Sequence, residues 1–272
     1  MLVIFSGGSG VGKNTVIAEL LKKGNFALLP TYTTRDKRPM ESEGNPYCFL
    51  TDAEFKKKIE ENELYEYENV HGHYYGTSKL LLKEKLALGK ILLKDIDVLG
   101  TQNLVKSVGG DVKILSLFLK VDSKEELVKR LMGRNEAEID KRLSRYEMEM
   151  SYADKYDYII TNNDLFETTR FVSEIIEAEK NGVLFKTAEK AAPDINRVDY
   201  YAEKLLAGET LSPMEITFHR GLPYILSGGE KYLASLKTGK RVAKEIKKEI
   251  SANIPNQTEW EKALYKLVGE GR

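Results

Sequence analysis

GGSGVGKNTV, residues 7–16, follows the apolar run LVIF at residues 2–5 after a single serine. It matches the phosphate-binding pattern G-x-x-x-x-G-K-[ST] at Gly7, Gly12 and Lys13. In such a loop, backbone N–H groups converge on phosphate oxygens at the N-terminus of the next helix, and the lysine bridges the β- and γ-phosphates. The order strand, glycine loop, helix therefore predicts a nucleotide-binding α/β fold. The residues expected at the donor phosphates are Gly8, Ser9, Gly10, Val11, Gly12, Lys13, Asn14 and Thr15.

Position 14 departs from this pattern. Asn14 stands where a serine or threonine hydroxyl normally binds Mg²⁺. The asparagine amide oxygen is a hard ligand that Mg²⁺ accepts, but the longer side chain requires a shift or a bridging water. Thr15 is the second candidate for this role. We therefore expect a weakened Mg²⁺ site rather than a lost one.

Composition narrows the class of protein. The 272 residues include 42 basic and 42 acidic side chains, so the chain has no general attraction for nucleic acid or anionic membranes. Cys48 is the only cysteine, which excludes an intrachain disulfide and a cysteine-based zinc site. No apolar run approaches the ~20 residues of a membrane span, and the run at residues 2–5 is too short for a signal peptide. We expect a cytoplasmic protein without a membrane partner.

Short apolar runs alternate with helical patterns, which predicts a parallel sheet flanked by helices. The predicted strands are residues 2–5, 91–96, 112–121 and 156–161. The predicted helices are residues 13–23, 78–88, 124–133, 135–151 and 164–180. Two capping boxes, Thr51 with Glu54 and Ser123 with Glu126, indicate helix starts.

Residues 31–77 differ in composition from the rest of the chain. They are rich in aromatic residues and threonine, with turn signals at Gly44 and Gly72. They predict a small, mostly antiparallel insert that holds a second substrate opposite the phosphate loop. Within it, Arg35 and Arg38 carry guanidinium groups suited to a phosphate monoester. A solvated charged face is the alternative interpretation of these two arginines.

Two carboxylates, Glu66 and Asp97, occur in otherwise apolar, strand-like segments. Carboxylates accept hydrogen bonds, so they suit a base edge that is rich in donors. Guanine presents N1–H and N2–H₂ at that edge, whereas adenine presents an acceptor at N1. Adenine would leave the buried acceptors unpaired, so the two carboxylates favour guanine as the bound base.

Motifs spread over residues 1 to about 180 resemble the guanylate kinase family. They read SGGSGVGKNT, TYTTRDKRPMESEGNPYCF, EFKKKIEENELYEYENVHGHYYGTSK, LLKDIDVLG, RLMGRNEAEIDKRL and YDYIITNNDL. Members of that family phosphorylate GMP or dGMP with ATP and Mg²⁺. The resemblance implies a P-loop kinase domain over residues 1–185, with the nucleoside-monophosphate insert at about 31–77 and a helical lid at about 130–150.

The resemblance also implies roles for individual residues. The phosphate of GMP would be held by Arg35, Arg38, Tyr47 and Tyr75, and its guanine by Thr31, Glu66, Thr77 and Asp97. Asp95 would lie near the metal with Asn14. The implied catalytic residues are Lys13 and the lid arginines Arg130, Arg134 and Arg142. The alternative for the threonines is that they only favour strand formation, and the alternative for the lid arginines is a charged helix pair. The lid segment is shorter than is common in the family.

Residues 190–272 lie outside this resemblance and predict a small α+β extension. The expected elements are a helix at 196–208, a strand pair in MEITFHRGLPYIL, and helices near 229–238, 240–251 and 257–268. The extension resembles the ParB/sulfiredoxin-like module, but its turn SGGEKY lacks the acidic residue and the His–Arg pair of that module. We therefore transfer no activity from it.

Three functional hypotheses follow. The first is an ATP:GMP phosphotransferase. The second is a binding module without catalysis, as guanylate kinase-like domains form in scaffold proteins, and Asn14 favours it slightly. The third is a kinase whose extension recruits nucleic acid or a protein through the basic run of Lys237, Lys240, Arg241, Lys244, Lys247 and Lys248. A solvated helix face is the alternative for that run.

Overall fold

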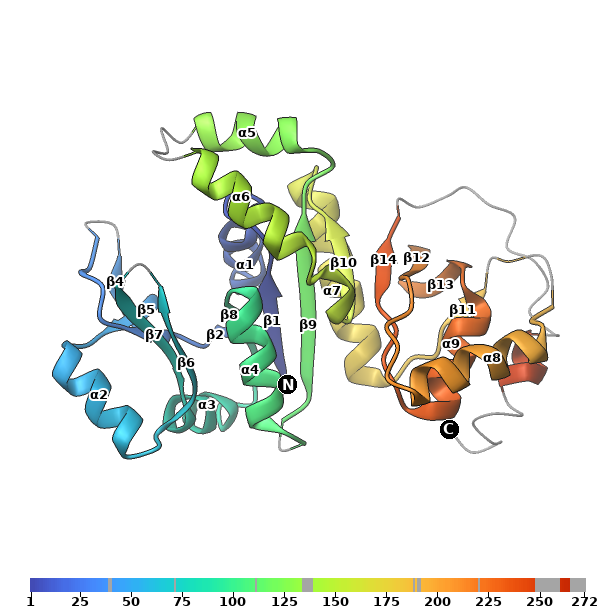
Figure 1. The fold of residues 1–272 in the computed structure, drawn as a ribbon, viewed down its shortest axis with the longest axis horizontal. Helices are drawn as coiled ribbons and strands as arrows, with labels where there is room; N and C mark the ends of the chain where they lie inside the picture. Colours follow the sequence, from blue (N-terminus) through green and yellow to red (C-terminus); the bar gives the residue numbers. More distant parts are fainter. Residues whose placement is uncertain are drawn as a thin grey trace. The chain divides into compact units, whose positions relative to one another are not determined.

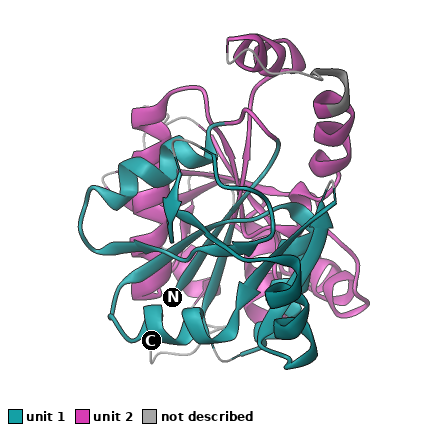
Figure 2. Cartoon of the chain, turned by 90° about the vertical axis from the view of Figure 1, so that its left-hand side faces the viewer, with its two compact units in different colours: residues 1–8, 12–116 teal, residues 9–11, 117–272 magenta. Residues whose placement is uncertain are grey.

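The computed structural model describes residues 1–38, 41–70, 72–110, 112–133, 139–187, 189, 192–219, 221–247 and 260–264. By its internal contacts the chain forms two compact units, which Figure 2 colours separately. Unit 1 comprises residues 1–8 and 12–116, and unit 2 comprises residues 9–11 and 117–272. Within the described ranges, no helix has the length and apolar character needed to cross a bilayer.

Unit 1 holds the N-terminal strands and helices of Figure 1. These are β1 (Leu2–Ser6), α1 (Lys13–Leu21), β2 (Phe26–Leu28), β3 (Thr31–Thr33), β4 (Ser42–Glu43), β5 (Pro46–Phe49), α2 (Asp52–Glu60), β6 (Leu64–Val70), β7 (His73–Ser78), α3 (Lys79–Leu86), β8 (Ile91–Asp95) and α4 (Val98–Val108). The Thr51 and Glu54 capping box begins α2 as predicted. The helix α4 was not predicted.

A parallel sheet forms the core of unit 1. Strand β8 lies between β1 and β2 and pairs in parallel with both, with Leu2 opposite Leu92. All five residues of β1 are buried, as expected for a parallel strand covered on both faces. Leu92 packs with Leu82 and Leu104 in an apolar cluster. The sheet therefore places the carboxyl ends of β1 and β8 side by side, where the phosphate loop begins.

The insert forms a second sheet in unit 1, with strand order β4-β5-β3-β7-β6. The pairs β3–β7 and β6–β7 are antiparallel, but β3–β5 and β4–β5 are parallel. The sheet is therefore mixed rather than mostly antiparallel. The reason is that the two strands that follow β3 in the chain, β4 and β5, run in the same direction as β3. Its register places Thr31 beside Tyr47, and Glu66 beside Thr77.

Unit 2 contains the remaining elements. These are β9 (Ile114–Lys120, whose first residues belong to unit 1), α5 (Lys124–Met132), α6 (Ile139–Met150), a 3₁₀ turn (Ala153–Lys155), β10 (Tyr158–Thr161), α7 (Leu165–Asn181), β11 (Lys186–Thr187), α8 (Ile195–Leu206), β12 (Met214–His219), β13 (Leu222–Ser227), α9 (Gly229–Thr238) and β14 (Lys244–Ile246). The helix α5 begins at its predicted cap, Ser123. The strand pair β12–β13 and helices α8 and α9 lie where the sequence predicts them.

Strand β14 corrects one prediction. Residues 240–251 were expected to be a helix, but Lys244–Ile246 form a strand that pairs in parallel with both β10 and β12. Its flanks Val242 and Ala243 are buried, as is Ile246. Pairing with β10 and β12 outweighs the local helical charge pattern. The strands of the extension thereby continue the sheet of β9 and β10, and the domain boundary at 185–190 stays a prediction.

Candidate active site

The phosphate loop connects β1 to α1. Gly12 caps α1 with φ 95°, and Gly7 and Gly10 also have positive φ. A Cβ atom added at Gly10 would lie 3.0 Å from Cδ2 of Leu131, so this position needs glycine for two reasons. The loop therefore turns as sharply as phosphate binding by backbone N–H groups requires.

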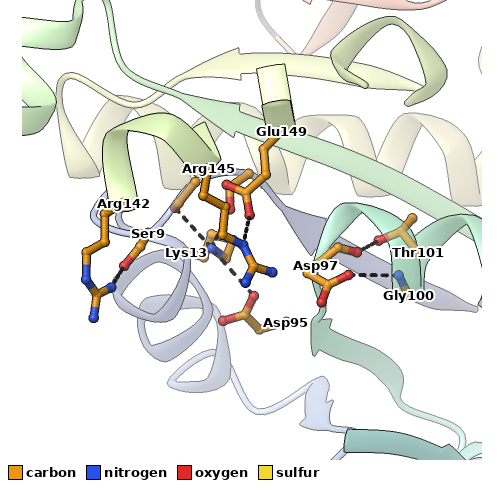
Figure 3. A network of polar contacts seen from close by, with 11 residues as sticks. Ser9, Lys13, Asp95, Asp97, Gly100, Thr101, Arg142, Arg145 and Glu149 are labelled. Carbon is orange, nitrogen blue, oxygen red and sulfur yellow. Dashed lines mark hydrogen bonds and ion pairs between the residues drawn. The ribbon is translucent and has the colours of Figure 1, made fainter. Parts of the chain in front are cut away.

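Lys13 is held within the loop itself. Its Nζ donates to the carbonyl oxygens of Gly7, at 2.7 Å, and Gly8, at 3.1 Å. The same Nζ lies 3.8 Å from Oδ1 of Asp95 at the end of β8, and Figure 3 shows the two side chains directed toward each other. Burial raises the pKa of Asp95, and the Lys13 and Lys94 ammonium groups oppose that rise. A cationic side chain and a carboxylate thus meet where the donor phosphates are expected.

Asn14 and Asp95 line one cavity of about 190 Å³ in unit 1. Thr31 and Tyr47 also line it, whereas Thr15 is exposed and absent from its lining. No cluster of three or more His, Cys, Asp or Glu residues that could hold a metal occurs among the described residues. One amide oxygen and one carboxylate fit Mg²⁺ bound mainly through nucleotide phosphates and water, because Mg²⁺ sites of that kind use one or two protein ligands.

A second cavity of unit 1, of about 210 Å³, gathers most of the residues predicted to hold GMP. Its lining includes Thr31, Tyr47, Glu66, Tyr75 and Asp97. Thr31, Tyr47 and Asp95 line both this cavity and the one beside Asn14. The two cavities therefore adjoin along these three side chains.

Glu66 is the buried carboxylate of this pocket, with 8% of its surface exposed. Burial raises its pKa, while the positive charge of Lys94 and a hydrogen bond from Thr77 Oγ1 oppose that rise. Asp97 also caps α4, since its Oδ1 accepts from the backbone N–H of Gly100 at 2.8 Å. Both carboxylates thus present acceptor oxygens from fixed elements.

The two insert arginines do not line either cavity. Arg35 Nη2 donates to Glu41 Oε1 at 2.7 Å, and its guanidinium lies 5.1 Å from the ring centroid of Tyr47. Arg38 is exposed, and its backbone N–H donates to Glu41 Oε2 at 2.9 Å. Glu41 raises the pKa of Arg35, and Arg35 lowers that of Glu41. Glu41, which sequence reasoning missed, therefore orders the loop that carries both arginines.

Unit 2 contains the residues that were predicted to form the lid. Arg142 Nη1 on α6 donates to Ser9 Oγ, a loop residue of the same unit (Figure 3). Arg130 Nε donates to Glu126 Oε1 at 2.8 Å. Arg134 lies outside the described residues. Asn162, at the end of β10, is buried and its Nδ2 donates to the carbonyl of Val11 at 2.7 Å. Asn162 thus supports the loop backbone, a role that sequence reasoning missed.

Lys94 is a further residue that sequence reasoning missed. It is fully buried on β8, and its Nζ donates to Thr31 Oγ1 at 2.7 Å. Burial lowers the pKa of Lys94 to about 8, against the opposing effect of Glu66, so the side chain is mainly protonated at neutral pH. The signal available in the sequence was a lysine inside the apolar strand ILLKD.

A glycine loop between a parallel strand and a helix, beside an acceptor-lined pocket, defines a P-loop nucleotide kinase. Comparisons with known proteins identify the family within this class. The guanylate kinase family model matches residues 1–179. The guanylate kinase of Bartonella henselae is 40% identical over 181 residues, covering 65% of this chain and 81% of that protein. That of Fusobacterium nucleatum is 40% identical over 185 residues, covering 67% and 97%.

A solved structure agrees. The crystal structure of guanylate kinase from Anaplasma phagocytophilum matches with a TM-score of 0.53 and 31% identity, over 66% of this chain and 85% of that one. The chain belongs to the guanylate kinase family. The predicted fold class and the predicted enzyme class are thereby confirmed. The resemblance of residues 190–272 to the ParB/sulfiredoxin-like module stays a prediction.

Proposed function

We propose that this chain transfers the γ-phosphoryl group of ATP to GMP, and to dGMP, in a reaction that requires Mg²⁺. The observation that carries the proposal is the shared lining of the two cavities by Thr31, Tyr47 and Asp95. A base held near Glu66 would direct its phosphate toward the end of the pocket that adjoins Asn14. Acceptor and donor phosphates would then meet beside Lys13.

The residues present account for the steps of transfer. The phosphate of GMP is already ionised at neutral pH, so no general base is needed, and catalysis rests on positioning and on charge neutralisation. Lys13 would neutralise the β- and γ-phosphates once nucleotide replaces the carbonyl oxygens that it now contacts. Asn14 and Asp95 would hold Mg²⁺, which when bound neutralises charge on the same phosphates.

The insert residues would hold the acceptor. Tyr47 and Tyr75 line the pocket and offer phenolic donors to the phosphate. Arg35 would join them from its position against the Tyr47 ring, since a guanidinium has five N–H donors and Glu41 does not occupy them all. Arg38 would have to turn inward from its exposed position. Glu66 and Asp97 would accept from N1–H and N2–H₂ of guanine, with Thr31 and Thr77 beside them.

The lid arginines would act on the donor. We propose that Arg130, Arg134 and Arg142 offset charge that develops on the transferred phosphoryl group. The contact of Arg142 with Ser9 supports this role, because it joins the lid helix α6 to the phosphate loop.

We also propose that the reaction takes place in the cytoplasm, where ATP is the abundant donor. Recruitment of a nucleic acid or protein through residues 190–272 stays a prediction, which salt-dependent retention on nucleic acid would test.

The decisive experiment measures ADP formation from ATP and Mg²⁺ with GMP and, separately, with AMP. Wild type and Asn14→Ser are compared, with EDTA as the metal-free control. We expect turnover of GMP and not of AMP by both proteins, and a higher rate for Asn14→Ser because serine restores the usual Mg²⁺ ligand. Turnover by Asn14→Ser alone would refute catalysis by the natural chain and favour a binding role.

A further inference from the structure

Lys94 is a charged side chain near the carboxyl end of the parallel strand β8, and the steps of transfer described above do not use it. In the register of the two strands Lys94 lies opposite Ile4 of β1, and none of its surface is exposed. Lysine is almost never fully buried unless it is paired, because removing an ammonium from water is unfavourable. The hydrogen-bond partner of the buried ammonium group therefore indicates the role of Lys94.

The hydrogen-bond partner of Lys94 among the described residues is the hydroxyl of Thr31, at 2.7 Å. A protonated lysine has three N–H donors and no acceptor, so Thr31 must accept in this bond. The hydroxyl hydrogen of Thr31 then points away from Lys94. Because Thr31 lines the GMP pocket, this hydrogen is available to an acceptor atom of a bound base.

Glu66 completes the pattern from β6, which β7 separates from the strand β3 that carries Thr31. Its carboxylate lines the same pocket and already accepts from Thr77. The positive charge of Lys94 attracts Glu66 and favours its ionised form, which only accepts. The pocket thus presents a donor at Thr31 and an acceptor at Glu66. Guanine has the complementary edge, an acceptor at O6 beside donors at N1 and N2, whereas adenine has a donor at N6 and an acceptor at N1.

We infer that Lys94 is a positioning residue for base selection: through Thr31 it fixes a hydroxyl donor for the 6-oxo group of the bound guanine. This inference rests on GMP being the acceptor and adds which residue of this chain orients the hydroxyl of Thr31. Lys94 itself does not contact the substrate. It sets the direction in which Thr31 donates and balances the charge of Glu66 opposite.

The test compares two ligands that differ at position 6 alone. GMP and 6-thio-GMP share N1–H and N2–H₂, but the thiocarbonyl sulfur is the weaker acceptor. Dissociation constants are measured by calorimetry at neutral pH without ATP, and KM and kcat are measured for both acceptors. The proteins are wild type, Lys94→Met, Lys94→Gln, Thr31→Val and the double variant Lys94→Met/Thr31→Val. Lys90→Met, an exposed lysine one residue before β8, is the matched control.

We expect wild type and Lys90→Met to prefer GMP by on the order of 10-fold, the effect of one hydrogen bond. Lys94→Met and Thr31→Val should each reduce this preference to about 2-fold or less, mainly through KM. The double variant should lose no more than either single variant, because both remove the same interaction. Lys94→Gln, which keeps an N–H donor for Thr31, should retain part of the preference.

Several outcomes would overturn the inference. Equal weakening of both ligands by Lys94→Met would show a role in folding alone. If Thr31→Val keeps the full preference for GMP over 6-thio-GMP, the inference is refuted. This result decides even if Lys94→Met does not fold, which the loss of its cooperative unfolding transition would show. Additive losses in the double variant would also refute it. A wild type that binds GMP without preferring it to 6-thio-GMP refutes this inference only, whereas a wild type that binds no GMP refutes the proposed function.

Discussion

Replacing Glu66 by glutamine tests the guanine site directly. Glu66 is 8% exposed and its carboxylate accepts from Thr77, so the change alters charge and hydrogen bonding but hardly alters shape. The amide nitrogen would bring a donor to a position where guanine also donates. A hydrogen bond to a charged group contributes about 1.5–3 kcal/mol. Losing one should therefore lower kcat/KM for GMP by roughly 10- to 150-fold.

The pH profile of the same variant gives a second readout. Burial raises the pKa of Glu66, so its protonated form, which accepts less well, is populated at a higher pH than for an ordinary glutamate. For wild type we expect kcat/KM for GMP to fall as the pH falls through this raised pKa. Glu66→Gln should lack the part of the acid limb that Glu66 contributes, because glutamine does not titrate, and should keep the part that the second ionisation of the GMP phosphate contributes.

The assay is steady-state ADP formation with varied GMP at saturating ATP and Mg²⁺, from about pH 5 to about pH 8, a window above the ordinary glutamate pKa in which a raised pKa is detected. Glu63→Gln is the control, since Glu63 pairs with Lys58 outside both cavities. A change of less than about 3-fold in kcat/KM for Glu66→Gln would contradict the reasoning. So would an acid limb that persists unchanged in the variant.

Three further predictions concern the loop and the metal. Asn162→Ala removes the donor to the Val11 carbonyl, so the free energy of unfolding in urea should fall by about 1–3 kcal/mol; an unchanged midpoint would contradict it. Gly10→Ala would place a Cβ atom 3.0 Å from Cδ2 of Leu131 at a residue with φ 89°, so the free energy of unfolding should fall by about 2–4 kcal/mol. Gly24→Ala, with φ 78° and open space, should lose only about 1–2 kcal/mol, and equal losses would argue against the close contact. Removing Mg²⁺ with EDTA should abolish turnover while GMP still binds, and residual turnover would exclude the metal role.

Most of the phosphate loop could be predicted because its determinants are contiguous in the chain. The glycines that need positive φ, the lysine that follows them and the strand before them all fall within residues 2–13. The two capping boxes were predictable for the same reason, since the bonds of Thr51 with Glu54 span three residues. The guanine-binding set was predicted from a family resemblance, and the pocket brings most of it together.

The missed features depend on residues far apart in sequence. The bond from Lys94 to Thr31 spans 63 positions, and the bond from Asn162 to Val11 spans 151. Only the tertiary packing of segments that are distant in the chain brings such partners into contact. Strand β14 shows the same limit, because its charge pattern indicates a helix until β10 and β12 pair with it on either side.

The sequence by itself determined the phosphate loop, the starts of α2 and α5 and the family of this protein, because each depends on neighbouring residues or on motifs at short spacing. The tertiary structure alone decided which polar groups are buried together. It placed the ammonium of Lys94 against Thr31, where its positive charge also acts on Glu66. The physical reason is that a buried charge is stable only where another segment supplies its partner, and the packing of distant elements rather than local propensity brings that partner close.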